Sequence, residues 1–201
     1  IIAVVFISCA AYLGKSDNLI NYVDPFIGSG GHGHVFVGAN VPFGGVQVGP
    51  TNFNKGWDWS SSYHHTDSIV KGFCHINVSG TGMSDLGELT IMPATGKLMT
   101  GAGTQNNHMA GYSSLYYKDK EHASVGYYKV HLERYDIDVE LTATERVGLH
   151  KYRFPKSDQS RVIIDLGEGS ADRPTETYLK KINDTLFQGH RFSSGWARDQ
   201  R

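Results

Sequence analysis

The sequence has almost no net charge and few charged side chains of either sign. Its 201 residues contain 19 Lys and Arg against 20 Asp and Glu, a formal net charge of −1 at pH 7 with histidine neutral. Because nucleic-acid binding requires a clustered basic surface, this balance removes the electrostatic basis for a nucleic-acid-binding protein. Charged residues make up 19% of the chain, below the average of about 25%, so its surface must be polar mainly through hydroxyls, amides and imidazoles.

Cysteine and long apolar runs are also scarce. The two cysteines, Cys9 and Cys74, provide no disulfide framework, and we expect Cys74 to be a small buried apolar residue. The apolar residues 1–14 are too few to span a bilayer, which needs about 20 residues, and they resemble the apolar part of a secretory signal. Phe6-Ile7-Ser8-Cys9 resembles a bacterial lipobox, which predicts lipidation of Cys9; a plain signal peptide with an incidental cysteine is the alternative.

These features predict the domain organisation and the location of the protein. We expect residues 1–20 to be a truncated signal or lipoprotein segment with a linker, and residues 21–201 to be one domain that is truncated at its C-terminal end. The protein is expected to be exported, as a periplasmic or cell-surface lipoprotein of a bacterium with a lipid anchor at Cys9.

The chain lacks helical periodicity, and strand-like alternation recurs instead. Short alternating or apolar runs are separated by Gly, Pro, Asn and Asp, which are typical turn residues. This pattern predicts an all-β fold, an antiparallel β-sandwich. The strands are expected at residues 45–48, 88–92, 125–133, 137–144, 149–154, 161–166, 177–182 and 185–191.

Residues 21–87 differ from the rest because they are rich in Gly, His and aromatic residues and show little alternation. Loops of this length in a compact domain are usually functional or disordered, and the aromatic content argues against disorder. We therefore expect long, ordered Gly- and aromatic-rich loops at one edge of the sandwich.

Residues 28–34 (Gly-Ser-Gly-Gly-His-Gly-His) form a glycine-rich stretch that can approach a ligand closely. No Gly-Lys-Ser/Thr follows, so the signature of a phosphate-binding loop is incomplete. His32 and His34 would face one side of an extended segment and could ligate a metal, but acidic and cysteine ligands at a recognisable spacing are absent. A structural turn is another alternative. We favour a binding loop, in which Gly31, His32, Gly33 and His34 contact a polar, neutral ligand.

Residues 56–65 contain the densest aromatic cluster. A sugar presents apolar C–H faces and a ring of hydroxyls, so its site needs an aromatic wall beside hydrogen-bonding groups. Trp57, Asp58, Tyr63 and His64 can supply them. If residues 57–59 are extended, the two tryptophans point to the same side, and core packing is the alternative role for at least one of them. No two carboxylates in the sequence are fixed at a catalytic separation, so no catalytic residue is predicted.

Together these motifs resemble the N-terminal domain of glycoside hydrolase family 92, the calcium-dependent exo-acting α-mannosidases. The resemblance runs in order from about residue 21 to residue 201. The motifs that carry it are Tyr22-Val23-Asp24-Pro25-Phe26-Ile27-Gly28, Gly30-Gly31-His32-Gly33-His34, Val41-Pro42-Phe43-Gly44-Gly45-Val46-Gln47, Gly56-Trp57-Asp58-Trp59, Ser79-Gly80-Thr81-Gly82, Glu140-Leu141-Thr142-Ala143-Thr144-Glu145-Arg146 and Ser194-Gly195-Trp196-Ala197-Arg198-Asp199-Gln200.

The resemblance implies a two-domain enzyme, with a β-sandwich followed by an (α/α)6 toroid that the 201 residues do not contain. It implies an inverting exo-α-mannosidase, with α-1,2 linkages expected, that trims mannose from N-glycans or mannans. The catalytic carboxylates and the main Ca²⁺ ligands would belong to the toroid, and the sandwich would contribute substrate-binding loops. By this resemblance we assign that role to Gly31, His32, Gly33, His34, Trp57 and Asp58, together with Tyr63 and His64, and expect the 201 residues alone to be inactive.

Two other functions fit parts of the sequence. A non-catalytic carbohydrate-binding sandwich fits the absence of a predicted catalytic pair. An amidase that cleaves glycan–asparagine links belongs to another sandwich-bearing class of glycoprotein hydrolases.

Overall fold

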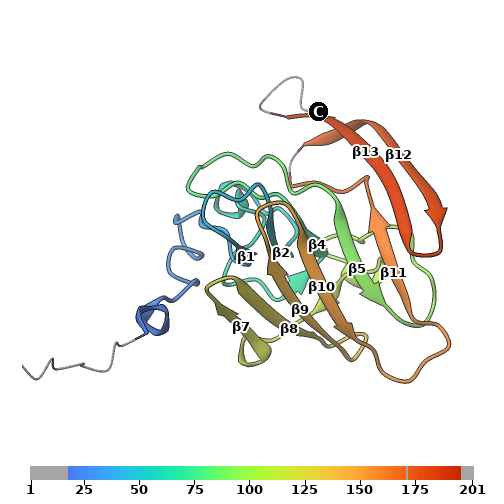
Figure 1. Cartoon of the computed structure of the whole chain (residues 1–201), viewed down its shortest axis with the longest axis horizontal. Coiled ribbons are helices and arrows are strands. Elements are labelled where there is room, and N and C mark those ends of the chain that lie inside the picture. Colours follow the sequence, from blue (N-terminus) through green and yellow to red (C-terminus); the bar gives the residue numbers. More distant parts are fainter. Residues whose placement is uncertain (1–17, 171, 196–201) are drawn as a thin grey trace, which may run out of the picture.

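The computed structural model describes residues 18–170 and 172–195, and Cys9, the predicted lipidation site, lies outside them. The described chain is all-β and its strands pair in antiparallel fashion, which confirms the predicted fold class (Figure 1). Among these residues no helix has the length and apolar character needed to cross a membrane.

Two sheets and two strand pairs make up the fold. The five-stranded sheet has the order β1-β2-β4-β5-β11, and the four-stranded sheet has the order β10-β9-β8-β7. The first sheet contains β1 (Ala39–Asn40), β2 (Gln47–Thr51), β4 (Gly72–Cys74), β5 (Thr90–Ala94) and β11 (Arg161–Asp165); the second contains β7 (Glu121–Ser124), β8 (Tyr127–Leu132), β9 (Ile137–Ala143) and β10 (Gly148–Arg153). The hairpin of β12 (Arg173–Asn183) and β13 (Leu186–Ser194) and the pair of β3 (Ile69–Val70) and β6 (Ser114–Leu115) complete the strands. Four short 3-10 helices connect them: η1 (Leu19–Tyr22), η2 (Trp57–Trp59), η3 (His108–Ala110) and η4 (Lys118–Lys120).

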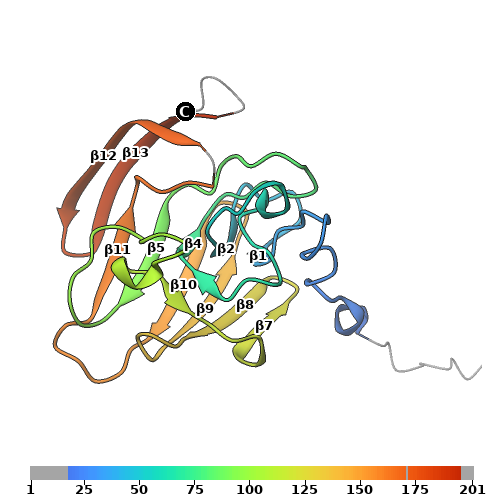
Figure 2. The same ribbon diagram turned by 180° about the vertical axis from the view of Figure 1, so that it is seen from behind.

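The core lies between the two sheets, where β1 and β2 contact β9 (Figure 2). In β9 the alternation predicted from the sequence is observed, since Ile137, Val139 and Leu141 are buried and the residues between them are partly exposed. Burial of each such side chain stabilises the fold by about 1.5–3 kcal/mol. Cys74 is buried and forms no disulfide, as its expected role requires.

The sequence predicted the long strands better than the short ones. The runs at 125–133, 137–144, 149–154 and 161–166 correspond to β8, β9, β10 and β11, and the last two runs correspond to β12 and β13. The strands β1, β3, β4 and β6 have only two or three residues, too few for alternation to be visible. The strand β7 was also missed, because it begins with a charged residue, Glu121, that points into the core.

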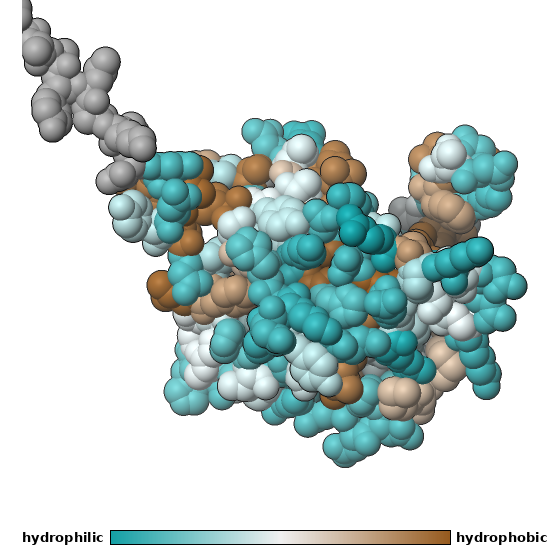
Figure 3. All heavy atoms as spheres, turned by 90° about the horizontal axis from the view of Figure 1, so that it is seen from below, coloured by the Kyte–Doolittle hydropathy of each residue, from teal (hydrophilic) through white to brown (hydrophobic). Residues whose placement is uncertain are grey.

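The outer surface is mostly polar. On the face of the molecule seen in Figure 3, hydrophilic residues predominate and apolar residues form separate patches. This surface agrees with the near-neutral, hydroxyl- and amide-rich composition of the chain.

A buried carboxylate connects the four-stranded sheet to the segment that follows η2. The Glu121 side chain is only 1% exposed. It accepts hydrogen bonds from the hydroxyls of Tyr63 (3.0 Å) and Tyr128 (2.7 Å) and from Nζ of Lys118 (2.9 Å). Burial raises the pKa of Tyr63, and the neighbouring Tyr116 and Glu121 act in the same direction, so the Tyr63 hydroxyl stays protonated and is a hydrogen-bond donor.

A second polar connection joins the two sheets through histidines. Nδ1 of His75 lies 3.4 Å from the carbonyl of Leu89 and must donate to it, because a carbonyl only accepts. Nε2 of His75 is therefore the acceptor for Nε2–H of His150 at 3.0 Å, and Nδ1 of His150 accepts from the Tyr152 hydroxyl at 2.7 Å. When both rings are neutral, the hydrogen-bond partners therefore assign each proton of the His75, His150 and Tyr152 side chains to one atom.

Replacing Glu121 by Ala is expected to lower the free energy of unfolding by about 3 kcal/mol, because it leaves Lys118 and two tyrosine hydroxyls without their acceptor. The matched control is Glu133→Ala, which removes a more exposed partner of Lys120 and should cost less than about 1 kcal/mol. Urea denaturation measures both values. Similar losses in the two variants would contradict a structural role for the Glu121 network.

Acid should weaken the fold through His150. Burial, with His75 as a smaller cause, lowers the pKa of His150 to about 3, from 6.5 in an unfolded chain. Because the folded-state pKa lies below the unfolded value, the unfolded chain binds this proton more readily than the folded one. The contribution of neutral His150 to the free energy of unfolding is therefore complete above pH 6.5 and is lost as the pH falls towards 3. Between pH 7.5 and 5 the loss should be about 2 kcal/mol. Urea titrations should show that the free energy of unfolding of His150→Leu declines less over this pH range than that of the wild type. His122→Leu, at an exposed position on β7, should show the wild-type decline.

Candidate functional site

The glycine-rich loop at residues 28–34 is a tight turn that depends on its glycines. A Cβ on Gly33 would lie 2.0 Å from the backbone oxygen of Gly28, so no side chain fits there. Gly31 has a φ of +55°, in the left-handed region that glycine adopts without strain. His34 has a φ of +54°. A non-glycine residue in this conformation costs about 1–3 kcal/mol, and such residues cluster at functional sites.

Neighbouring segments hold this loop on two sides. The backbone N–H of His65 donates to the carbonyl of Ser29 at 2.8 Å, and the N–H of Gly80 donates to the carbonyl of His34 at 2.7 Å. Nε2 of His64 lies 3.3 Å from the carbonyl of Gly31. The loop is therefore ordered, as its aromatic surroundings predicted.

The loop places two histidines against the aromatic segment that begins with η2. Nδ1 of His32 lies 2.6 Å from Oδ1 of Asp58, and Nε2 of His34 lies 3.5 Å from the same oxygen. The ring of His34 meets Trp57 edge-on, with centroids 4.3 Å apart, and His32 lies 5.1 Å from it at a tilt. His32 and Asp58, which are 26 positions apart in the chain, thus form one cluster with His34 and Trp57 that contains an indole, two imidazoles and a carboxylate.

Trp57 is 57% exposed and carries the largest aromatic ring of this cluster, beside the exposed side chain of His32. Residues 57–59 form a 3-10 turn and not an extended strand, so the two tryptophans do not share a side as they would in a strand. Trp59 instead donates its Nε1–H to Asp67 at 2.9 Å. Gly82 lies against the Trp57 indole, since a Cβ there would be 2.3 Å from Nε1. The exposed part of the Trp57 ring remains available to a ligand.

The His34 ring has a buried nitrogen beside this cluster that makes no hydrogen bond. His34 is 6% exposed, and its Nε2 makes no hydrogen bond, because the contact with Asp58 is long. Buried polar atoms in native proteins are nearly always paired. Hydrogen bonding to His32 lowers the pKa of the Asp58 carboxyl, which keeps it ionised and a strong acceptor. A ligand hydroxyl that reached both groups from one side would bond to Asp58 and satisfy this nitrogen.

The structure brings most of the predicted binding residues together but not all. Gly31, His32, Gly33, His34, Trp57 and Asp58 lie in or beside the cluster. Tyr63 does not, because it is 1% exposed and its hydroxyl is bonded to Glu121 in the core. The expectation that Tyr63 contacts a sugar is therefore at odds with the structure. His64 is also buried, and it contacts the loop from beneath.

Sequence reasoning missed two contributors to the site. Gly82 shapes the space beside Trp57, and Asp67 holds the second tryptophan. The Ser-Gly-Thr-Gly motif at 79–82 was noticed for its resemblance, but its contact with Trp57 could not be read from the sequence. Nothing in the sequence distinguishes Asp67 as a supporting residue, since a lone carboxylate in a loop is common.

The described residues do not form a metal centre. None of them makes a group of three or more His, Cys, Asp or Glu side chains close enough to hold a metal ion. Calcium takes six to eight oxygen ligands, whereas the cluster offers one carboxylate and two imidazoles. These residues therefore do not fit the Ca²⁺ that the resemblance implies, and their chemistry is that of hydrogen bonding and stacking.

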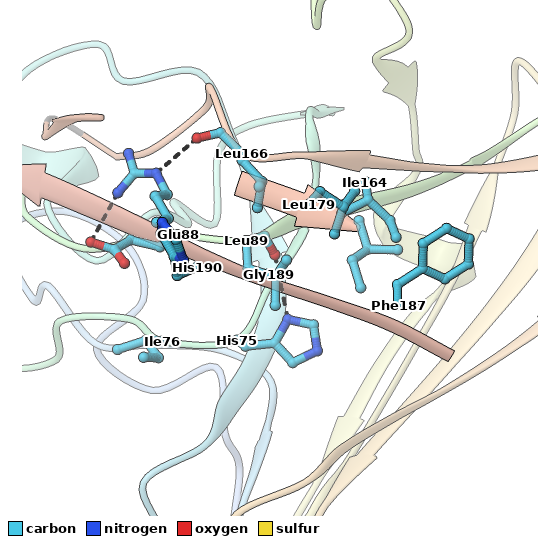
Figure 4. A pocket seen from close by; sticks show the side chains of 12 residues that line it. His75, Ile76, Glu88, Leu89, Ile164, Leu166, Leu179, Phe187, Gly189 and His190 are labelled. Carbon is cyan, nitrogen blue, oxygen red and sulfur yellow. Dashed lines mark hydrogen bonds and ion pairs between the residues drawn. The ribbon is translucent and has the colours of Figure 1, made fainter. Parts of the chain in front are cut away.

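A separate cavity of about 390 Å³ lies beneath the β12–β13 hairpin (Figure 4). Leu179 and Phe187 of the hairpin face Ile164 of β11 there. At one end Arg191 is paired with Glu88 at 2.9 Å and with Asp172 at 2.6 Å, so these charges fasten the hairpin to the body of the domain. The lining is mainly apolar, which does not suit a polyhydroxylated ligand.

Comparisons with known proteins agree with the resemblance seen in the sequence and with the fold. Residues 22–201 match the Glycosyl hydrolase family 92 N-terminal domain. A GH92 α-mannosidase from Bacteroides thetaiotaomicron, solved in complex with mannoimidazole, has 35% sequence identity and a TM-score of 0.87, with 90% of this chain and 24% of that chain covered.

Two more distant relatives extend the likeness. A GH92 inverting mannosidase from Bacteroides thetaiotaomicron has a TM-score of 0.61 at 24% identity, over 75% of this chain and 20% of that chain, which supports the fold alone. An "uncharacterized secreted glycosidase" of Arthroderma benhamiae is 26% identical over 166 residues, which cover 74% of this chain and 20% of that protein. The chain thus spans a quarter or less of these relatives.

Gly82→Ala is expected to displace the Trp57 indole, because the new Cβ would overlap Nε1. Acrylamide quenching of tryptophan fluorescence should detect the changed exposure of the ring. The control is Gly101→Ala, where a Cβ meets no atom within 4 Å, and it should leave the quenching unchanged. Identical quenching in both variants would show that the indole does not depend on Gly82.

Proposed function

Because the chain belongs to glycoside hydrolase family 92, as its N-terminal domain, we propose that it is the substrate-binding part of an exo-α-mannosidase. The observation that carries the proposal is the exposed Trp57 ring beside the Asp58 carboxylate and the unpaired Nε2 of His34. An indole face and a pair of hydrogen-bonding groups together match the two faces of a sugar.

Each group has a distinct task in sugar binding. The Trp57 ring packs against the apolar C–H face of a mannose unit. The Asp58 carboxylate accepts hydrogen bonds from sugar hydroxyls, and such charge-assisted bonds are stronger than neutral ones. His32 holds Asp58 in place at 2.6 Å. His34 supplies the second hydrogen-bonding partner for a hydroxyl, since its Nε2 is buried without one.

The finer features of the enzyme are part of the same proposal. We infer an inverting reaction on α-1,2-linked mannose of N-glycans or mannans, with the catalytic acid and base about 6.5–9.5 Å apart in a C-terminal toroid of the same chain. Ca²⁺ would be held mainly by that domain. Export of the protein as a bacterial lipoprotein through Cys9 completes the proposal, and the secreted relative supports export.

Trp57→Ala in the full-length enzyme is expected to weaken binding of mannoimidazole, the ligand of the solved α-mannosidase, by about tenfold, which corresponds to about 1.4 kcal/mol of lost contact. Isothermal titration calorimetry measures the Kd. Met109→Ala is the control, because Met109 is equally exposed at 57% but does not belong to the cluster.

Mannose release from α-linked mannobiose tests the activity itself. Wild-type enzyme that neither releases mannose in the presence of Ca²⁺ nor binds mannoimidazole would overturn the proposed function. Release of free glycan together with an aspartyl peptide would instead identify an amidase.

A further inference from the structure

His64 lies beneath the 28–34 loop and its ring is fixed on three sides. One face stacks on Trp59, with centroids 4.3 Å apart and planes at 26°. Nδ1 lies 2.8 Å from the hydroxyl and 3.3 Å from the backbone N–H of Thr66. Nε2 lies 3.3 Å from the carbonyl of Gly31. This ring directly links the aromatic segment to the Gly31 carbonyl of the loop.

The hydrogen-bond partners determine the tautomer of His64. The backbone N–H of Thr66 can only donate, so Nδ1 carries a lone pair. A neutral ring then has its proton on Nε2, which donates to the Gly31 carbonyl. The bond to the loop therefore depends on a nitrogen at the far end of the ring.

The stacking partner of His64 is itself held by a buried carboxylate. Asp67 accepts from Nε1 of Trp59 at 2.9 Å and pairs with Nζ of Lys55 at 2.8 Å. The same Lys55 ammonium lies 5.3 Å from the centre of the Trp59 ring. Oδ1 of Asp67 accepts from the backbone N–H groups of Ser68 and Ile69, at the start of β3. Contacts thus run from β3 through Trp59 and His64 to Gly31.

We propose that His64 is a positioning residue of the sugar site, which acts through the Gly31 carbonyl; the inference rests on the proposed function. Gly31 has a positive φ and immediately precedes His32, whose ring holds Asp58. Fixing the Gly31 peptide fixes the direction in which His32 leaves the backbone. Without the bond, the His32–Asp58 pair and the adjacent His34 lose their shared orientation towards a ligand.

Two substitutions separate this role from simple packing. His64→Gln places an amide N–H near the position of Nε2 and can still donate to Gly31. His64→Asn has its amide near Nδ1, so it can reach Thr66 but not Gly31. Both remove the imidazole that stacks on Trp59, so a packing role alone predicts equal effects.

The experiment measures the Kd of mannoimidazole for the full-length enzyme by calorimetry, with the Tm of each variant as a folding check. His64→Gln is expected to bind within about threefold of wild type, and His64→Asn about tenfold more weakly, at similar Tm. His131→Asn on β8, where the ring contacts Asp138 and not the 28–34 loop, should bind like wild type. If His64→Asn does not fold, Thr66→Val replaces it, because Thr66 is exposed and tolerates the change. This variant removes the hydroxyl that contacts Nδ1 of His64, and it is expected to bind about threefold more weakly than wild type.

Equal Kd values for the two His64 variants, in an enzyme whose wild type binds mannoimidazole, would overturn the positioning role alone. If Thr66→Val is used instead, an unchanged Kd would likewise overturn the positioning role. A wild-type enzyme that does not bind mannoimidazole would overturn the proposed function and this inference with it.

Discussion

The arrangement of the site depends on the buried carboxylate of Glu121. It binds the hydroxyls of Tyr63 and Tyr128 and the ammonium of Lys118, and so fixes the segment after η2 to the four-stranded sheet. A buried carboxylate is costly unless it is paired and hydrogen-bonded, and here a cation and two hydroxyls donate to it. Since Tyr63 is adjacent to His64, the same interaction determines the place from which His64 reaches the glycine-rich loop.

The candidate site is supported by buried residues on one side and exposed on the other. Tyr63 and His64 are buried and connect it to the core, while Trp57 is exposed and Asp58 is ionised. Most polar groups beneath the surface are paired, whereas Nε2 of His34 is not. Paired supporting groups together with one unpaired nitrogen beside an exposed indole and a carboxylate are what a hydrogen-bonding ligand requires. The cavity beneath the hairpin differs from this site, because its lining is mainly apolar and its Arg191 is paired with Glu88 and Asp172.

Much of the fold was predictable because strand alternation is a local property. Ile137, Val139 and Leu141 recur every second residue, and this spacing alone predicts a strand with one buried face. The strand β7 was missed because its inward residue, Glu121, is charged, and only its partners from distant segments make its burial possible. Trp57 and Asp58 were correctly grouped with the loop histidines, but the 3-10 turn that separates the directions of Trp57 and Trp59 was not predicted.

The sequence by itself determined the all-β class and the near-neutral polar surface, and it singled out Gly31, His32, Gly33, His34, Trp57, Asp58, Tyr63 and His64 as binding candidates. These follow from composition, period and residue chemistry, which are local. Only the tertiary structure decided which of these residues are exposed and which are buried beneath them. Tyr63 and His64 have the same chemistry as exposed binding residues, but their burial is decided by Glu121 and Gly31, which lie 58 and 33 positions away in the chain. Hydrogen bonds over such separations leave no periodic pattern in the sequence.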